Sequence, residues 1–176
     1  SGGSHQRYSG WATQIFKLSN ERYALELDEQ GRGFSLAQRS AGNREQVDLT
    51  QRPLSTLSAT GKIFYLLETP SAADSDHSTP EIWSLHSSPR PAPGAQYGVH
   101  PQRKSLGYSC LHRDLQAHAK VSVHRNDALE RWDITLTNTG SSERVVQLIS
   151  FRDLMLRANG AADRHRSAGY VRPDPA

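Results

Sequence analysis

The segment from Trp132 to Leu156 constrains the fold more than any other part of the chain, because it predicts two long β-strands. Between Trp132 and Thr137, apolar and polar side chains alternate, which is the period of a strand with one buried face. Residues 138–142 are Asn-Thr-Gly-Ser-Ser, a composition that reverses the chain because it supplies left-handed backbone positions and hydrogen bonds from side chains to the backbone. A second, largely apolar strand follows. These residues are therefore predicted to form a β-hairpin inside an extended sheet.

Other segments alternate with the same period. Residues 23–28 and 33–38 are predicted to pair as a hairpin. The clearest alternation runs from Leu115 to His124, where one face is apolar and the other polar. The apolar face is predicted to be core, and the polar face to be solvated or to line a groove. The range 106–151 is predicted to form an antiparallel meander of at least three strands.

The composition agrees with one all-β domain. At 176 residues the chain is long enough for one domain with a core and too short for two of ordinary size. Only 22% of the residues are charged and many are Ser, Thr, Gly or Pro, which suits strands joined by turns. The 21 basic and 18 acidic residues are interspersed, so no nucleic-acid partner is expected. The single cysteine, Cys110, excludes an intrachain disulfide, agrees with a reducing compartment and is expected in the core.

Three regions are expected along the chain. Residues 1–17 are expected to be a flexible N-terminus or an expression scar, residues 18–158 a β-sandwich domain, and residues 159–176 a loop-like tail. Residues 69–80 and 87–94 are rich in Pro, Ser and Asp and are predicted to be surface loops. No apolar run approaches the roughly 20 residues that cross a bilayer, and the start of the chain lacks the apolar stretch of a signal peptide. The expected localisation is cytoplasmic.

Short motifs spread over the chain occur in a common order. They are Leu18-Ser19-Asn20-Glu21-Arg22-Tyr23, Gly31-Arg32-Gly33-Phe34-Ser35, Gly61–Glu68, Glu81-Ile82-Trp83-Ser84, Leu106-Gly107-Tyr108-Ser109 and the segment from Trp132 to Phe151. Together they resemble the N-terminal β-sandwich of glycoside hydrolase family 94, also described as glycosyltransferase family 36. This is the group of cellobiose phosphorylase and the cyclic β-1,2-glucan synthases. Phe34 departs from the family pattern by replacing a tyrosine, and Lys104 and Ser105 replace a histidine and a glycine. Arg166 and Tyr170 depart from the family's Asp followed by His-Pro and an aromatic.

The resemblance implies an antiparallel β-sandwich of the supersandwich, galactose-mutarotase-like type, with few or no helices. Residues 159–176 lack the pattern of further strands, so the sandwich could be incomplete. An edge left unpaired in that way would favour a homodimer. In the family, the catalytic acid and the phosphate-binding residues lie in a helical (α/α)6 barrel that follows the sandwich. The resemblance therefore implies that this chain is not an enzyme on its own and carries no cofactor.

No residues have the spacing of a catalytic or metal site. The carboxylates on predicted strands and turns are expected to be solvated or to cap turns: Asp114, Asp133, Glu143 and Asp153. The segment His112-Arg113-Asp114-Leu115 imitates the catalytic loop of protein kinases, but Ala119 stands where that loop has a metal-binding Asn. His118 and His124 share a strand face but are about 20 Å apart along an extended strand, too far for one ion. No metal site is assigned.

Aromatic side chains are the expected contacts with a sugar, because the axial hydrogens of a pyranose ring lie flat against an aromatic face. Trp83, His86 and Tyr97 are close to predicted loops, where ligands are usually bound. Tyr108 belongs to one of the family motifs. These four residues are the predicted carbohydrate-binding residues. Trp132 alternates in phase with core positions and is expected to pack in the core.

Two functions from different classes follow from these observations. The first is a non-catalytic, carbohydrate-binding or carbohydrate-associated module that contacts a β-glucan or gluco-oligosaccharide beside an adjacent or partner catalytic domain. The alternative is a structural or dimerisation module that supports a separate (α/α)6 barrel and binds no free sugar. The family's glucan synthases are anchored in membranes through other segments. The resemblance therefore leaves both a membrane-associated and a soluble parent protein as alternatives.

Overall fold

The computed structural model describes residues 14–40, 43–50, 62–69, 79–158 and 161–170. In this part of the chain there are twelve strands, all paired antiparallel, in three four-stranded sheets, and there is no helix. None of these residues forms a helix long and apolar enough to span a membrane. The all-β, antiparallel fold class predicted from the sequence is therefore confirmed.

The three sheets are named A, B and C. Sheet A has the order β1-β2-β3-β4, with β1 at Ile15–Ser19, β2 at Tyr23–Asp28, β3 at Gly33–Ser40 and β4 at Asn43–Asp48. Sheet B has the order β12-β11-β5-β6, with β5 at Lys62–Thr69, β6 at Glu81–Ser84, β11 at Val145–Ala158 and β12 at Ala161–Tyr170. Sheet C has the order β10-β9-β8-β7, with β7 at Gln96–Pro101, β8 at Ser105–His112, β9 at Leu115–Val123 and β10 at Glu130–Asn138.

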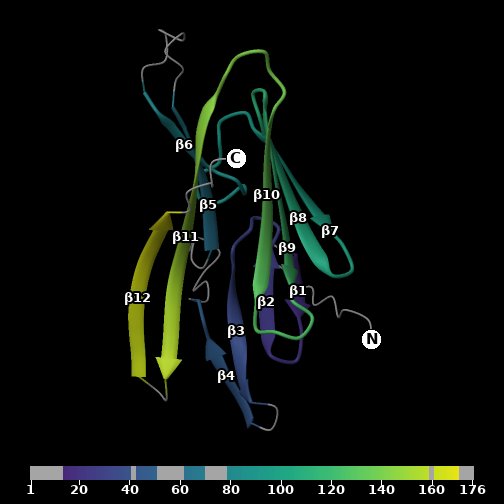
Figure 1. Cartoon of the computed structure of the whole chain (residues 1–176), viewed down its shortest axis with the longest axis vertical. Coiled ribbons are helices and arrows are strands. Elements are labelled where there is room, and N and C mark those ends of the chain that lie inside the picture. Colours follow the sequence, from purple (N-terminus) through teal and green to yellow (C-terminus); the bar gives the residue numbers. More distant parts are fainter. Residues whose placement is uncertain (1–13, 41–42, 51–61, 70–78, 159–160, 171–176) are drawn as a thin grey trace.

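Figure 1 shows how the three sheets are arranged, and buried apolar side chains from all of them form one core. Sheets A and B are linked by an antiparallel bridge between Thr50, which follows β4, and Leu154 on β11. Strands β1 and β2 of sheet A lie against β9 of sheet C. Phe64 of sheet B contacts Trp132 of sheet C, with 5.0 Å between the ring centroids. Sheet C therefore faces both other sheets, and buried apolar side chains from all three share the core.

The alternating patterns place the core where the sequence predicted it. The fully buried side chains of β9 are Leu115, Ala117, Ala119 and Val121, and those between them are half-buried or exposed. Burial of one large apolar side chain contributes about 1.5–3 kcal/mol to stability. Cys110 on β8 is completely buried, and Trp132 on β10 packs against the core edge. The predicted hairpin of β2 and β3 is confirmed, as is the meander of β8, β9 and β10.

β10 and β11 are strands as predicted, but the predicted hairpin between them is wrong. β10 pairs with β9, whereas β11 pairs with β5 and β12, so residues 139–144 cross from sheet C to sheet B. The start of this connection is fixed because the Thr139 backbone N–H and hydroxyl both donate to the Asp114 carbonyl oxygen, at 2.8 and 2.9 Å. Its end is fixed because the Arg144 guanidinium donates two hydrogen bonds of 2.6 Å to the Glu68 carboxylate on β5.

The C-terminal region also differs from the predicted loop-like tail. Residues 161–170 form β12, which pairs along β11. Ala158 is the register partner of Ala161, so two residues, Asn159 and Gly160, connect these strands. An Asn-Gly pair between strands is a strong sequence signal for a hairpin. The sequence still predicts a loop here because β12 contains no β-branched residue, the type most typical of strands.

The N-terminal boundary of the sandwich lies earlier than expected. β1 begins at Ile15 and pairs with β2, so the sandwich starts before residue 18. Residues 1–13 of the expected flexible N-terminus and residues 70–78 of the first expected loop lie outside the described residues. The second expected loop, residues 87–94, contains no strand, as predicted.

Candidate functional site

Three of the four predicted carbohydrate-binding residues lie in the core. Trp83 on β6, His86 just after β6 and Tyr108 on β8 have exposed fractions of 1, 2 and 2%. The Trp83 ring meets the His112 ring edge-on at 5.4 Å between centroids, and the Tyr108 ring meets the His86 ring edge-on at 4.5 Å. The Tyr108 hydroxyl donates a 2.8 Å hydrogen bond to the Asp28 carbonyl oxygen, which ties sheet C to sheet A. Protein atoms therefore cover these rings, and no ring face is open to a sugar.

His86 lies where the sheets meet. Its ring contacts Tyr108 of sheet C and lies against Gly31 in the β2–β3 turn, where an added Cβ atom would overlap the imidazole. Gly31 has a φ of +77°, a left-handed conformation that also favours glycine. Burial, together with the nearby Arg152 charge, lowers the pKa of His86 to about 3, so the imidazole is neutral at physiological pH. No described residue forms a hydrogen bond with its Nε2 atom.

Tyr97, the fourth predicted residue, is half-buried on β7 and holds a loop in place. Its hydroxyl accepts a 2.9 Å hydrogen bond from the Ala92 backbone N–H and donates a 3.2 Å hydrogen bond to the Ser84 carbonyl oxygen. Burial raises the pKa of Tyr97 to about 12, so the hydroxyl keeps the proton that the second bond needs. Tyr97 therefore attaches the loop at residues 87–94 to the end of β6.

No aromatic platform is open to solvent in the part of the chain that the structure describes. The Phe, Tyr and Trp side chains described are all buried or half-buried. Half-buried rings such as those of Phe16 and Trp132 pack against the core. A surface that stacks on a sugar needs an exposed aromatic face. The predicted sugar-binding residues are thus gathered around the core and at a loop attachment.

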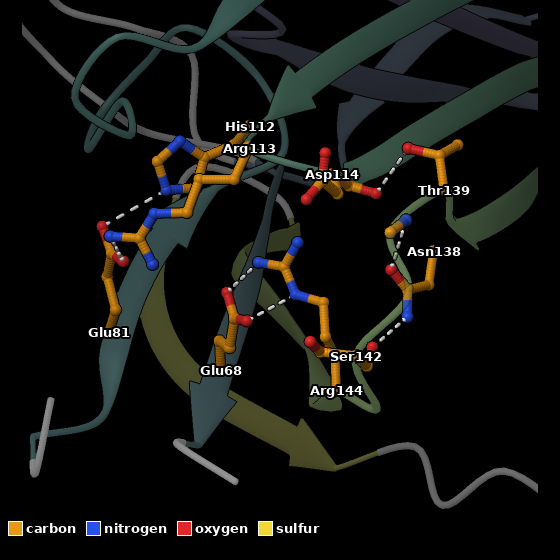
Figure 2. A network of polar contacts seen from close by, with 10 residues as sticks. Glu68, Glu81, His112, Arg113, Asp114, Asn138, Thr139, Ser142 and Arg144 are labelled. Carbon is orange, nitrogen blue, oxygen red and sulfur yellow. Dashed lines mark hydrogen bonds and ion pairs between the residues drawn. The ribbon is translucent and has the colours of Figure 1, made fainter. Parts of the chain in front are cut away.

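A polar cleft lies where β5 and β6 of sheet B approach the β8–β9 turn and the β10–β11 connection (Figure 2). Its volume is about 430 Å³, within the range of small-molecule sites. We call it the crossover cleft, because the connection that crosses between the sheets forms one wall. Its charged and amide side chains include those of Glu68, Glu81, Arg90, Arg113, Asn138 and Arg144.

Two ion-pair systems fix four of the charged side chains that line the crossover cleft. Glu68 and Arg144 share two hydrogen bonds of 2.6 Å, the bidentate geometry that orients a guanidinium most firmly. Glu81 on β6 reaches Arg113 at 3.2 Å and the His112 Nε2 atom at 3.5 Å, as Figure 2 shows. Arg113 belongs to the two-residue β8–β9 turn and has a φ of 53°, a conformation that such tight hairpin turns require. Both carboxylates are therefore already engaged by cations.

Another wall of the crossover cleft carries neutral hydrogen-bonding groups (Figure 2). The Asn138 Nδ2 atom donates to the Ser142 carbonyl oxygen at 2.7 Å, and its Oδ1 atom accepts from the Gly140 backbone N–H at 3.1 Å. The Thr139 hydroxyl donates to the Asp114 carbonyl oxygen at 2.9 Å. These bonds fold the β10–β11 connection onto the β8–β9 turn and give the cleft a fixed shape.

The crossover cleft is suited to polar contacts. Inverting glycoside chemistry needs a protonated carboxyl group on one side of the sugar and an attacking group on the other. Glu68 instead accepts hydrogen bonds from Arg144, and Glu81 forms an ion pair with Arg113. Among the described residues, no three His, Cys, Asp or Glu side chains gather as ligands for a metal ion. What the cleft offers a partner is oriented donors and acceptors.

Sequence reasoning misses the crossover cleft because its parts are far apart in the chain. Glu68 and Arg144 are 76 positions apart and come together only because β5 pairs with β11. The segment His112-Arg113-Asp114-Leu115, which the sequence singles out for its kinase-like pattern, is the β8–β9 turn. No local pattern in either segment signals that the two form one surface.

Comparisons with known proteins agree with this architecture. A family model described as the glycosyl hydrolase 94 supersandwich domain matches residues 6–173. A search of curated proteins finds no match. The supersandwich is a non-catalytic module of these enzymes, and the matched region does not include their catalytic barrel. The chain therefore belongs to the glycosyl hydrolase 94 supersandwich-domain family.

Proposed function

We propose that this chain is a supporting module that docks onto the (α/α)6 catalytic domain of a glycosyl hydrolase 94 enzyme. The catalytic domain would belong to the same polypeptide or to a partner subunit. The observation that carries the proposal is that every described aromatic side chain is buried or half-buried, while the concave surface at the sheet crossover is polar and ion-paired. Such a module contributes to activity by holding a domain in position and makes no contact with the substrate itself.

The crossover cleft is the docking surface in this proposal. Non-obligate protein interfaces are about as polar as the rest of a protein surface and rely on well-placed hydrogen bonds. Because Glu68 orients Arg144 and Glu81 orients Arg113, these guanidinium groups lose little side-chain entropy when a partner binds. Arg90, exposed at the rim, adds a cation that can meet a partner's carboxylate.

Complex formation with a separately produced catalytic domain of this family tests the proposal. Sedimentation velocity of the two proteins together is expected to show an equimolar complex. Arg90→Glu reverses a charge at the rim and is expected to weaken the complex about tenfold or more. Lys120→Glu makes the same change of charge on the exposed face of β9 and is expected to leave the affinity unchanged. A folded chain that forms no complex, or equal effects of the two variants, would contradict docking at this cleft.

A gluco-oligosaccharide bound in the crossover cleft is the second candidate. The observation in its favour is a volume of about 430 Å³ lined by carboxylate, guanidinium and amide groups, which can hydrogen-bond sugar hydroxyls. This candidate moves carbohydrate binding away from Trp83, His86 and Tyr108. The resemblance to cyclic β-1,2-glucan synthases and cellobiose phosphorylase makes β-1,2- and β-1,4-linked oligosaccharides the ones to test. Saturable binding that is lost in Asn138→Ala would favour this candidate over docking.

We also propose that the chain forms a homodimer and that the protein is located in the cytoplasm. β10 is a nine-residue strand at the edge of sheet C, and an edge strand of this length can pair with a second copy. Sedimentation of the chain alone measures the dimer, and a monomer at all concentrations would exclude it. Fractionation of cells that produce the full-length protein tests the location.

A further inference from the structure

A second concave surface lies at the opposite end of β8 and β9 from the crossover cleft and has a volume of about 920 Å³. It is formed by β1 with the β1–β2 turn, by the β7–β8 connection and by the β9–β10 connection. We call it the basic groove, because the cations that line it are Lys17, Arg22, Arg103, Lys104 and Arg125. Its acidic side chains are Glu21 and Asp127, so its net charge is +3, which equals the formal net charge of the whole chain.

Most of these cations lack a counter-charge. Lys17 forms an ion pair with Glu26 at 3.5 Å, and Asp127 is engaged by His124 at 2.9 Å. The cations that are exposed and form no ion pair with any described residue are Arg22, Arg103, Lys104 and Arg125. Like charges gathered in this way repel one another and attract anions. The basic groove is therefore the surface of this domain most favourable to an anionic ligand.

Asn20 fixes the walls of the basic groove. Its Nδ2 atom donates to the carbonyl oxygens of His124 and Asp127 at 2.6 and 2.7 Å. Its Oδ1 atom accepts from the backbone N–H groups of Arg22 and Tyr23 at 2.7 Å each. One side-chain amide thereby joins the β1–β2 turn of sheet A to the β9–β10 connection of sheet C. The backbone segments that carry the cations are held at a fixed spacing, which lowers the entropy cost of binding.

We propose that the basic groove binds a ligand that carries two or more phosphate groups. A phosphate monoester group brings a charge of about −1.5 to −2 near neutral pH, so two such groups offset the net charge of +3 in the groove. Guanidinium groups match phosphate oxygens with paired N–H donors, and three of the four cations are arginines. The proposal is independent of docking at the crossover cleft, because the two surfaces lie at opposite ends of sheet C.

Calorimetric titration of the folded chain with inorganic tripolyphosphate tests the proposal. Saturable binding is expected, and its affinity should fall as salt is added, because ions screen exposed charges. Arg103→Gln/Arg125→Gln is expected to weaken binding about tenfold or more. The control Arg90→Gln/Lys120→Gln removes the same charge outside the groove and is expected to change the affinity less than about twofold. Absence of binding, or equal weakening in both double variants, overturns the proposal.

Asn20→Ala separates a built groove from a diffuse basic patch. The variant keeps every charge but releases the β9–β10 connection from the β1–β2 turn, so a several-fold loss of affinity for tripolyphosphate is expected. Circular dichroism checks that the variant is folded, and an unchanged affinity in a folded variant contradicts the fixed groove. The double arginine variant keeps the test decisive if Asn20→Ala does not fold.

Clustered phosphate groups occur in soluble phosphorylated ligands and in the headgroups of a lipid surface. Binding to vesicles distinguishes these two sources. Binding of tripolyphosphate without binding to phosphatidylglycerol vesicles assigns a soluble phosphorylated ligand to the basic groove. Binding to phosphatidylglycerol but not phosphatidylcholine vesicles, with competition by tripolyphosphate, assigns lipid headgroups. Failure to bind either overturns the proposal and leaves the docking function untouched.

Discussion

The Lys62 ammonium on β5 and the Glu130 carboxylate on β10 form a buried ion pair that joins sheet B to sheet C. Glu130 also accepts hydrogen bonds from the Tyr23 hydroxyl of sheet A at 2.7 Å and from Trp132 Nε1 at 3.0 Å. Burial lowers the pKa of Lys62 to about 8, although the Glu130 charge opposes this. Burial alone would raise the pKa of Glu130, but the Lys62 charge and the hydrogen bonds outweigh it and lower the pKa. Both groups are charged at neutral pH, and the three sheets meet at one carboxylate.

Removal of one partner of this ion pair is expected to destabilise the fold strongly. Lys62→Met leaves the Glu130 charge buried without a counter-charge, so the free energy of unfolding should fall by about 3–5 kcal/mol. Lys62→Met/Glu130→Gln is expected to recover part of that loss, because Glu130→Gln removes the buried carboxylate charge that Lys62→Met leaves without its counter-charge. Urea unfolding of the three proteins measures both effects. A single variant as stable as the parent would show that the pair does not hold the sheets together.

His86 is expected to make the protein less stable in acid. The unfolded state binds a proton at this imidazole with a pKa of 6.5, the folded state only with a pKa of about 3. Between these values the unfolded state binds more protons, so the free energy of unfolding falls as the pH is lowered, by up to about 1.4 kcal/mol per unit.

Urea unfolding between about pH 7 and pH 5, where carboxylates stay ionised, measures this contribution. His86→Gln cannot take up the proton, so its stability should change less with pH than that of the parent. Parallel profiles of parent and variant would exclude His86 as the cause.

Trp83→Ala is expected to act on stability. The ring is 1% exposed in the core, so its removal leaves a cavity and should lower the free energy of unfolding by about 3–5 kcal/mol. His118→Ala, on the exposed face of β9, is the control and should change it by less than about 0.5 kcal/mol. Chemical denaturation measures both variants. A Trp83→Ala protein as stable as the parent would show that the Trp83 ring does not stabilise the core.

Arg144→Ala is expected to weaken the crossing from sheet C to sheet B. The bidentate pair with Glu68 has side chains only 12 and 14% exposed, so its loss should cost about 1.5–3 kcal/mol of unfolding free energy. The control is Arg131→Ala, whose pair with Asp133 has side chains 74 and 49% exposed and should contribute close to nothing. If the two variants lose the same stability, the crossover pair has no special role.

Local sequence patterns predict the strands well. The alternation of β9 encodes one buried face, and the two short segments 23–28 and 33–38 pair as β2 and β3, as predicted. Local patterns do not predict which distant strands pair with each other. The turn composition after strand β10 predicts a reversal, but the hydrogen bonds of Thr139 to the β8–β9 turn and of Arg144 to β5 direct β11 to sheet B. Those contacts exist only once the whole fold is formed.

Closeness to loops is a poor guide to exposure in this chain. Trp83 and His86 precede a Pro-rich loop, which favours an exposed position in sequence reasoning. In the structure that loop is fastened to β6 by the Tyr97 hydroxyl, and both rings lie in the core. The basic groove is an exposed site that no local sequence pattern signals. Its four unpaired cations come from three separate connections and gather only when sheets A and C pack together.

Calorimetric titration of the folded chain with β-1,2- and β-1,4-linked gluco-oligosaccharides tests whether this domain is a docking module that binds no free sugar. A docking module without an exposed aromatic platform is predicted to give no saturable heat with either linkage, while it still binds the catalytic domain. Saturable sugar binding by the parent chain that is lost in Asn138→Ala would contradict this account and assign the crossover cleft to carbohydrate.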